Sequence, residues 1–164
     1  MRLPRMLDTT VRWLQFGLLL GVCWMVMTFT HEVGHILAGW LGGGHLHSAD
    51  LLPWHLPQSR FEPDPHPLLT LWGGPVLGIA IPVVLASLIR HPLAWTVAHF
   101  CILSNGLYLA VAWYTGDNHL DTPRLFAAGG SPVVVALYCT LTITIGYLRF
   151  RKDCRSFFDS HAIH

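Results

Sequence analysis

Residues 13–41 read WLQFGLLLGVCWMVMTFTHEVGHILAGWL and set the class of fold. Apart from one glutamine and a few hydroxyl groups, the polar side chains within this stretch are His31, Glu32 and His35. A helix rises about 1.5 Å per residue, so roughly 20 residues cross a hydrocarbon core of about 30 Å. The stretch is long enough to predict a membrane-spanning helix, which the glycine triplet at 42–44 ends.

The composition of the whole chain also indicates a membrane protein. Hydrophobic residues make up 52% of the 164 residues, and charged residues make up 12%, whereas soluble domains carry roughly a quarter charged residues. So few charges could not cover the water-facing surface of a soluble domain of this size. The formal net charge is only +1, and the chain has no basic run interleaved with aromatic residues, so nucleic acid is excluded as a partner.

Three further apolar runs predict three more membrane spans, at residues 68–89, 93–114 and 125–148. The segment 42–67 between the first two spans is rich in proline and histidine and is predicted to be a loop. We therefore expect an all-α, polytopic membrane protein of about four transmembrane helices. Residues 1–164 are expected to form a single integral membrane domain.

The distribution of basic residues predicts the orientation of the chain. Four spans place both termini on the same side of the membrane. That side would carry Arg2, Arg5, Arg12, Arg90, Arg149, Arg151, Lys152 and Arg155, and the other side Arg60 and Arg124. Because basic residues are concentrated in cytoplasmic segments, both termini are predicted to be cytoplasmic.

The sequence His31-Glu32-Val33-Gly34-His35 is an H-E-x-x-H motif. Residues four apart lie on one helix face, about 40° apart, so His31 and His35 can both reach one ion. Zinc accepts two imidazoles and a third protein ligand while keeping one position for water. Glu32 is then placed to take the proton of that water and pass it to a leaving amine. The motif predicts His31 and His35 as metal ligands and Glu32 as the catalytic base.

The position of Glu32 strengthens this interpretation. Glu32 is the only glutamate in any of the apolar spans. A charged side chain at the centre of a membrane helix costs about 2.5–3.5 kcal/mol on insertion scales, so such a residue is a functional candidate. The structural alternative is a polar cluster at a helix end, lying in the headgroup region.

The third metal ligand is predicted from topology. The first and third spans run in the same direction, so His31 and His35 should lie level with the end of the third span. Asp117 lies just past that end and is the favoured ligand. Asp121 is the alternative, although it precedes Thr122-Pro123, where Thr122 would be an N-cap and an acid would have an ordinary helix-dipole role. Weaker candidates for a ligand are His119, His45 and His47.

Two other features of the sequence each have two interpretations. Gly73, Gly74 and Gly78 in the second span are expected to allow close helix packing, or to let a substrate strand approach. Asn105 in the third span is expected either to bond an exposed substrate backbone or to hold helices together.

These motifs resemble the site-2 protease class of intramembrane zinc metalloproteases. The resemblance extends over roughly Leu14 to Asp121, through the H-E-x-x-H motif, Gly73-Gly74-Pro75 at the start of the second span, and an acid at the end of the third. Many members carry Asn-Pro-Asp-Gly or Leu-Asp-Gly around their aspartate, whereas here Asn118 follows Asp117. The resemblance implies a three-span metalloprotease core and one zinc ion. It also implies hydrolysis of peptide bonds in membrane-embedded or membrane-adjacent substrates, that is, a zinc metalloendopeptidase.

Two other functions are compatible with the same residues. A noncatalytic membrane protein could bind or transport a metal through its eleven histidines. An inactive relative of the proteases could bind membrane helices without cleaving them. The first of these predicts that a Glu32→Gln variant keeps its function, which a protease would lose.

Overall fold

The computed structural model describes residues 3–52, 54 and 57–159. The elements in chain order are α1 (Leu3–Leu41), β1 (Leu46–Asp50), β2 (Gln58–Phe61), α2 (Pro67–Ile89), α3 (Pro92–Thr115), α4 (Asp121–Ala127) and α5 (Pro132–Asp159). The predicted all-α class is confirmed. The chain ends at 1–2 and 160–164, whose cytoplasmic location was predicted, lie outside the described residues.

Four of the helices are long and apolar enough to cross a membrane: α2, α3, α5 and the part of α1 from Thr9 to Leu41. They indicate a multi-pass membrane protein. Many of their large apolar side chains point outward, where lipid tails rather than water would cover them. α1 has 39 residues and is about 58 Å long, so it extends beyond a hydrocarbon core of about 30 Å.

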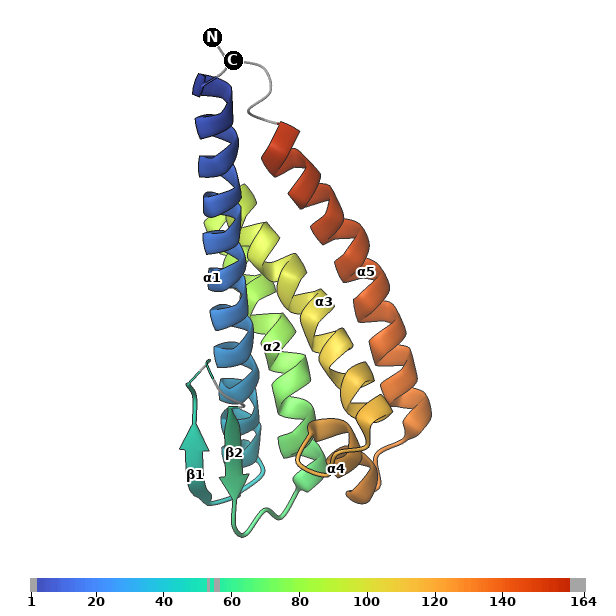
Figure 1. Ribbon diagram of the computed structural model, residues 1–164. Helices are drawn as coiled ribbons and strands as arrows, with labels where there is room; N and C mark the ends of the chain where they lie inside the picture. Colours follow the sequence, from blue (N-terminus) through green and yellow to red (C-terminus); the bar gives the residue numbers. More distant parts are fainter. Residues whose placement is uncertain (1–2, 53, 55–56, 160–164) are drawn as a thin grey trace.

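The four long helices lie side by side (Figure 1). α1 and α3 run in one direction, and α2 and α5 run in the other, as the predicted spans require. The first turns of α1 and the last turns of α5 meet at one end of the bundle, where the rings of Trp13 and Phe158 are 4.9 Å apart. We call this the Trp13 end. The opposite end, where α1 stops and where the hairpin and α4 lie, is the Leu41 end.

Small residues bring α1 and α2 into close contact, which confirms the predicted packing role of the glycines. A Cβ atom on Gly34 would collide with the Gly73 carbonyl, and one on Gly73 would collide with Ala38. A Cβ atom on Gly74 would occupy the space of the His35 imidazole. The glycines therefore let the motif-bearing part of α1 lie directly against α2.

The segment 42–67 is not only a loop, because it contains a β-hairpin. β1 and β2 are antiparallel, with Ala49 opposite Ser59. The ring of Phe61 covers Gly39 near the end of α1, where any side chain on that glycine would meet it. The prolines that predict a loop lie between and beyond the two short strands. Phe61 then anchors the hairpin against α1, a tertiary contact that a local pattern does not reveal.

The predicted fourth span, 125–148, begins too early, and the helix that contains most of it continues beyond residue 148. Its first residues belong to α4, and Gly129, with a φ of 89°, breaks the chain before α5 begins at Pro132. α5 continues to Asp159, past the basic residues from Arg149 onward. Charged residues end an apolar run, but arginine and lysine are good helix formers, so the helix itself does not stop there.

Candidate metal centre

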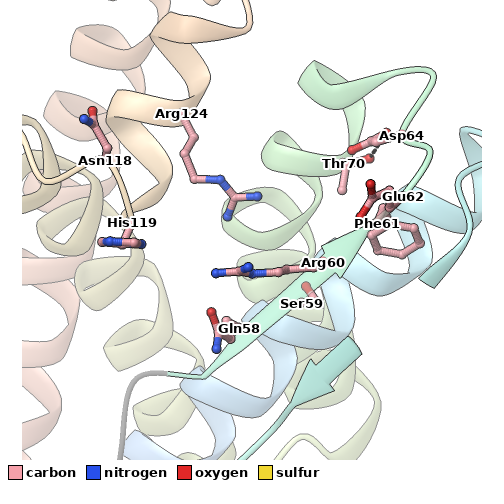
Figure 2. Close-up of a pocket in the computed structure, with 10 residues that line it drawn as sticks. All are labelled: Gln58, Ser59, Arg60, Phe61, Glu62, Asp64, Thr70, Asn118, His119 and Arg124. Carbon is pink, nitrogen blue, oxygen red and sulfur yellow. Dashed lines mark hydrogen bonds between the residues drawn. The ribbon is translucent and has the colours of Figure 1, made fainter. Parts of the chain in front are cut away.

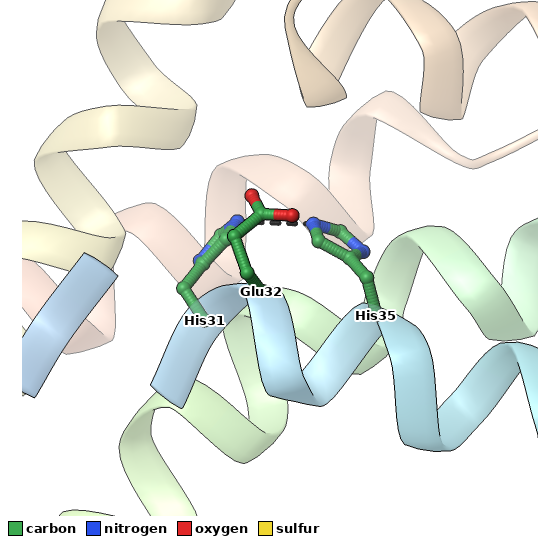
Figure 3. A group of neighbouring side chains, drawn as sticks. All are labelled: His31, Glu32 and His35. Carbon is green, nitrogen blue, oxygen red and sulfur yellow. Dashed lines mark hydrogen bonds between the residues drawn. The ribbon is translucent and has the colours of Figure 1, made fainter. Parts of the chain in front are cut away.

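His31 and His35 lie on one face of α1, as their spacing predicts (Figure 3). Both side chains are buried, and their Nε2 atoms are 3.1 Å apart. Figure 3 shows the Glu32 carboxylate beside the two rings. The ligand atoms that the three residues offer all lie within 4.8 Å of one another, so this group could hold a metal ion.

The acid that meets the two histidines is Asp121. Its Oδ2 atom lies 2.9 Å from Nε2 of His31 and 3.1 Å from Nε2 of His35, and its side chain is buried. Asp117, the residue that the sequence favours, is exposed, and its Oδ1 accepts a hydrogen bond from the His119 backbone N–H at 2.9 Å. The structure therefore brings the alternative candidate, Asp121, to the histidines and does not bring Asp117 there.

The turn after α3 explains this difference. Gly116 ends α3 in a left-handed conformation, with a φ of 66°, and the chain then folds back on the helix. Thr122 does not cap α4, because its hydroxyl donates to the Leu109 carbonyl at 2.8 Å. Leu125 is completely buried against Leu109 in the apolar core. These contacts dock α4 on α3 and direct Asp121, the first residue of α4, toward the motif.

The proton positions on His35 follow from its neighbours. Its Nδ1 lies 2.8 Å from the backbone carbonyl oxygen of Thr70, in the first turn of α2. A carbonyl oxygen can only accept, so Nδ1 must carry a proton. In a neutral imidazole, Nε2 then has a lone pair, and that lone pair faces His31 and Asp121.

The same reasoning applies to His31. Its Nδ1 lies 2.7 Å from Oδ1 of Asn105, which is completely buried. The amide of Asn105 is oriented by its other end, because Nδ2 donates to the Cys101 carbonyl at 2.9 Å. Nδ1 of His31 is therefore also a donor, and Nε2 of a neutral His31 also has a lone pair. Asn105 links α3 to α1 by holding a motif histidine.

Three lone-pair atoms thus converge on one point. They are the Nε2 atoms of His31 and His35 and Oδ2 of Asp121, which are separated by 2.9–3.1 Å. With both rings neutral, no hydrogen lies between them, so a cation would relieve their repulsion. Atoms bound at about 2.0–2.1 Å to a tetrahedral zinc ion are about 3.3 Å apart. The observed triangle is close to that size.

The negative charge of Asp121 also favours a bound cation. Burial by itself would raise the pKa of Asp121, but positive charge on His35 and hydrogen bonds donated by His31 and His35 lower that pKa below its usual range. With both rings neutral, a bound cation would take the place of those protons. Asp121 is therefore ionised at neutral pH and can act as an anionic ligand.

Glu32 is held beside this triangle by the hairpin. The hydroxyl of Ser59, a buried residue of β2, donates to Oε2 of Glu32 at 3.2 Å. A small inner cavity of about 20 Å³ adjoins Glu32, His35, Asp121 and Tyr108, which is room for about one water molecule. The sequence does not single out Ser59, because its role depends on where β2 docks.

The other histidine candidates lie apart from the ligand triangle. His45 and His47 are exposed residues at the start of the hairpin. His119 is exposed and lines the inner cavity, yet within the described part of the chain it forms no hydrogen bond with Asp121 or the motif histidines.

Comparisons of the chain with models of protein families, with curated proteins and with solved structures found no match. The fold and the site by themselves define the class: a membrane protein of four apolar helices with a buried His-Glu-His group able to hold a metal.

Proposed function

We propose that the protein is an intramembrane zinc metalloprotease that hydrolyses peptide bonds of membrane-embedded or membrane-adjacent substrates. One observation carries the proposal: the Nε2 atoms of His31 and His35 and Oδ2 of Asp121 converge within 2.9–3.1 Å, beside the Glu32 carboxylate. The resemblance of the motifs to site-2 proteases supports the same function.

The donor set supports zinc as the metal. Two imidazoles and one carboxylate are a common ligand set for catalytic zinc, and three protein ligands keep one coordination position open. The hydrogen bonds behind the two histidines also fit a zinc site, because Nδ1 of His31 donates to Asn105 and Nδ1 of His35 donates to Thr70. A zinc ion held here would supply Lewis-acid activation of water and polarisation of the scissile carbonyl.

Glu32 would act as the general base and then the general acid. It adjoins the inner cavity, which has room for about one water molecule. Its carboxylate would take the proton of that water and deliver it to the leaving amine. The hydrogen bond from Ser59 would keep one carboxylate oxygen in place and leave the other available for the proton.

The location of the site favours substrates in or near the membrane. His31, Glu32 and His35 are buried within a helix long and apolar enough to cross a bilayer. A peptide bond inside a substrate helix is shielded by the helix's own hydrogen bonds. The substrate must therefore unwind locally before the bond can reach Glu32.

The experiment measures zinc content and proteolysis together on Glu32→Gln. Purified wild type is expected to contain zinc and to cleave fluorescently labelled casein, whose peptide bonds need no unwinding. Glu32→Gln should retain zinc and lose about 10²–10⁴-fold in rate, the usual contribution of acid–base catalysis. Asp117→Asn is the matched control, since it makes the same kind of change at an exposed acid and should alter neither property.

Two results would contradict the proposal. A zinc-loaded wild type that cleaves neither labelled casein nor a labelled transmembrane peptide is not a protease. Zinc flux into vesicles that is the same for wild type and Glu32→Gln would instead favour a transport protein.

A further inference from the structure

A second, outer cavity of about 300 Å³ lies between β2 and α4, next to the metal centre (Figure 2). It shares five lining residues with the inner cavity: Gln58, Ser59, Thr70, His119 and Arg124. A group bound in the outer cavity would therefore lie beside the position of the reacting peptide bond.

The outer cavity brings together two basic residues that are far apart in the sequence. Arg60 comes from β2 and Arg124 from α4. Figure 2 shows both guanidinium groups extending into the same space, with His119 across from them. The other basic residues whose side chains are described belong to the first turns of α1, the α2–α3 connection and the second half of α5. Arg60 and Arg124 are thus the two basic residues that the described chain places at the Leu41 end.

These two charges are only partly compensated by direct ion pairs. Among the described residues, Arg60 has no carboxylate within ion-pair distance, and Arg124 Nη1 lies 3.9 Å from Oδ1 of Asp121, at the limit of that distance. Two acids also line the cavity. Asp64 Oδ1 accepts from the Thr70 hydroxyl at 3.0 Å, which holds this carboxylate against α2. Glu62 lies beside Phe61 rather than between the guanidinium groups.

We propose that Arg60 and Arg124 bind a carboxylate group of the peptide substrate. The planar guanidinium group matches a carboxylate in shape and can bond it with two parallel hydrogen bonds. The carboxylate would be either an acidic side chain close to the scissile bond or the C-terminus of the substrate. This inference rests on the proposed protease function and adds a substrate class to it, namely peptides with an anionic group at a fixed distance from the cleaved bond.

Cleavage of matched peptides tests the proposed preference for a substrate carboxylate. A series of internally quenched peptides carries one Glu that moves through an otherwise uncharged sequence, and each member has a partner with Gln at that position. Wild type should cleave the best Glu peptide at least about tenfold better in kcat/KM than its Gln partner. Arg60→Gln and Arg124→Gln should each reduce that ratio toward one while retaining zinc. Arg149→Gln removes an exposed charge from α5 and should leave the ratio unchanged.

Amidation of the peptide C-terminus distinguishes the two sources of the carboxylate. If the side chain is recognised, amidating the C-terminus of the best Glu peptide leaves its cleavage unchanged. If the C-terminus is recognised, the Glu and Gln peptides are cleaved equally well while their C-terminus is free, cleavage of both depends on Arg60 and Arg124, and amidation reduces cleavage of both.

Binding to Glu32→Gln separates failure of this inference from failure of the proposed function. Fluorescence anisotropy that shows tighter binding of the Glu peptide than of the Gln peptide, dependent on Arg60, supports the carboxylate site even if wild type cleaves nothing. Cleavage that depends neither on the internal Glu nor on a free C-terminus overturns the inference and leaves the protease intact. Arg60-dependent binding of phosphatidylglycerol nanodiscs, without binding of the acidic peptide, would identify a lipid headgroup site. That result would also overturn the inference.

Discussion

Among the described residues, histidine and aspartate side chains meet at two places, one toward each end of the bundle. Toward the Trp13 end, Nδ1 of His99 lies 2.7 Å from Oδ2 of Asp153, and this pair joins α3 to α5. At the Leu41 end, His31 and His35 share one oxygen of Asp121. In the first contact one donor meets one acceptor, so the bond is complete. In the second, hydrogen bonds to Asn105 and Thr70 use the N–H of each neutral ring.

The comparison shows what distinguishes a candidate metal centre from an ordinary polar contact. Residue types and distances are similar in the two places. The difference is the number of lone pairs directed at one point without a hydrogen between them. A cation satisfies the cluster around Asp121, whereas the pair of His99 and Asp153 needs none.

The strongest way to test the comparison is to remove each aspartate in turn. Asp121→Ala should reduce the zinc content from about one ion per chain to nearly none and should abolish cleavage, because a three-ligand site loses its only carboxylate. Asp153→Ala should leave both unchanged. Zinc is measured by mass spectrometry on protein purified in detergent. Full zinc content in Asp121→Ala, together with its loss in Asp117→Ala, would restore Asp117 as the ligand.

Removal of the metal should affect stability only through the cluster around Asp121. A ligand present at a thousand times its Kd stabilises the folded state by about 4 kcal/mol. Adding a chelator to zinc-loaded wild type should therefore lower its unfolding midpoint clearly, as followed by thermal unfolding in detergent. Asp121→Ala should unfold at the same temperature with and without chelator. An equal response of the two proteins would show that the chelator acts elsewhere.

The part of the site that could be predicted from the sequence is the part that lies on one helix. The spacing of His31 and His35 determines their common face through helix geometry alone, and the apolar run around Glu32 marks it as unusual. The apolar runs likewise indicate the first three spans to within one or two residues, apart from the start of α1, which lies well before residue 13. These features depend on residues that are neighbours in the chain.

The part that could not be predicted depends on how the chain turns between helices. The topology predicts that the end of the third span lies level with the motif, which makes both Asp117 and Asp121 candidates. The choice between them depends on the reversal at Gly116 and on the bond from Thr122 to α3. Ser59 reaches Glu32 only because β2 docks on α1. Such tertiary contacts have no local signal.

A smaller effect is expected from Asn105, which holds His31 from behind. Asn105→Leu removes the acceptor that orients Nδ1 of His31, and loss of such a partner usually costs 10–100-fold in metal affinity. Competition with a coloured zinc chelator measures that affinity. Ser104→Ala, a polar-to-apolar change at the adjacent position in α3, should leave it within about twofold. If both variants bind zinc as wild type does, the tautomer of His31 is not controlled by Asn105.

The smallest effect is expected at the other contact. Asp153→Ala removes the acceptor of the His99 hydrogen bond, and a typical hydrogen bond contributes about 1 kcal/mol to stability. The side chains of His99 and Asp153 are 15% and 22% exposed, so water can partly replace the lost partner. Asp153→Asn keeps an acceptor oxygen for the His99 N–H and should recover most of the loss in denaturant unfolding. Neither variant should change the zinc affinity, because His99 and Asp153 join α3 to α5 away from the ligand triangle. A fall in zinc affinity as large as that expected for Asn105→Leu would mean that the two ends of α3 are coupled, and the contrast between an isolated hydrogen bond and a metal-binding cluster would then fail.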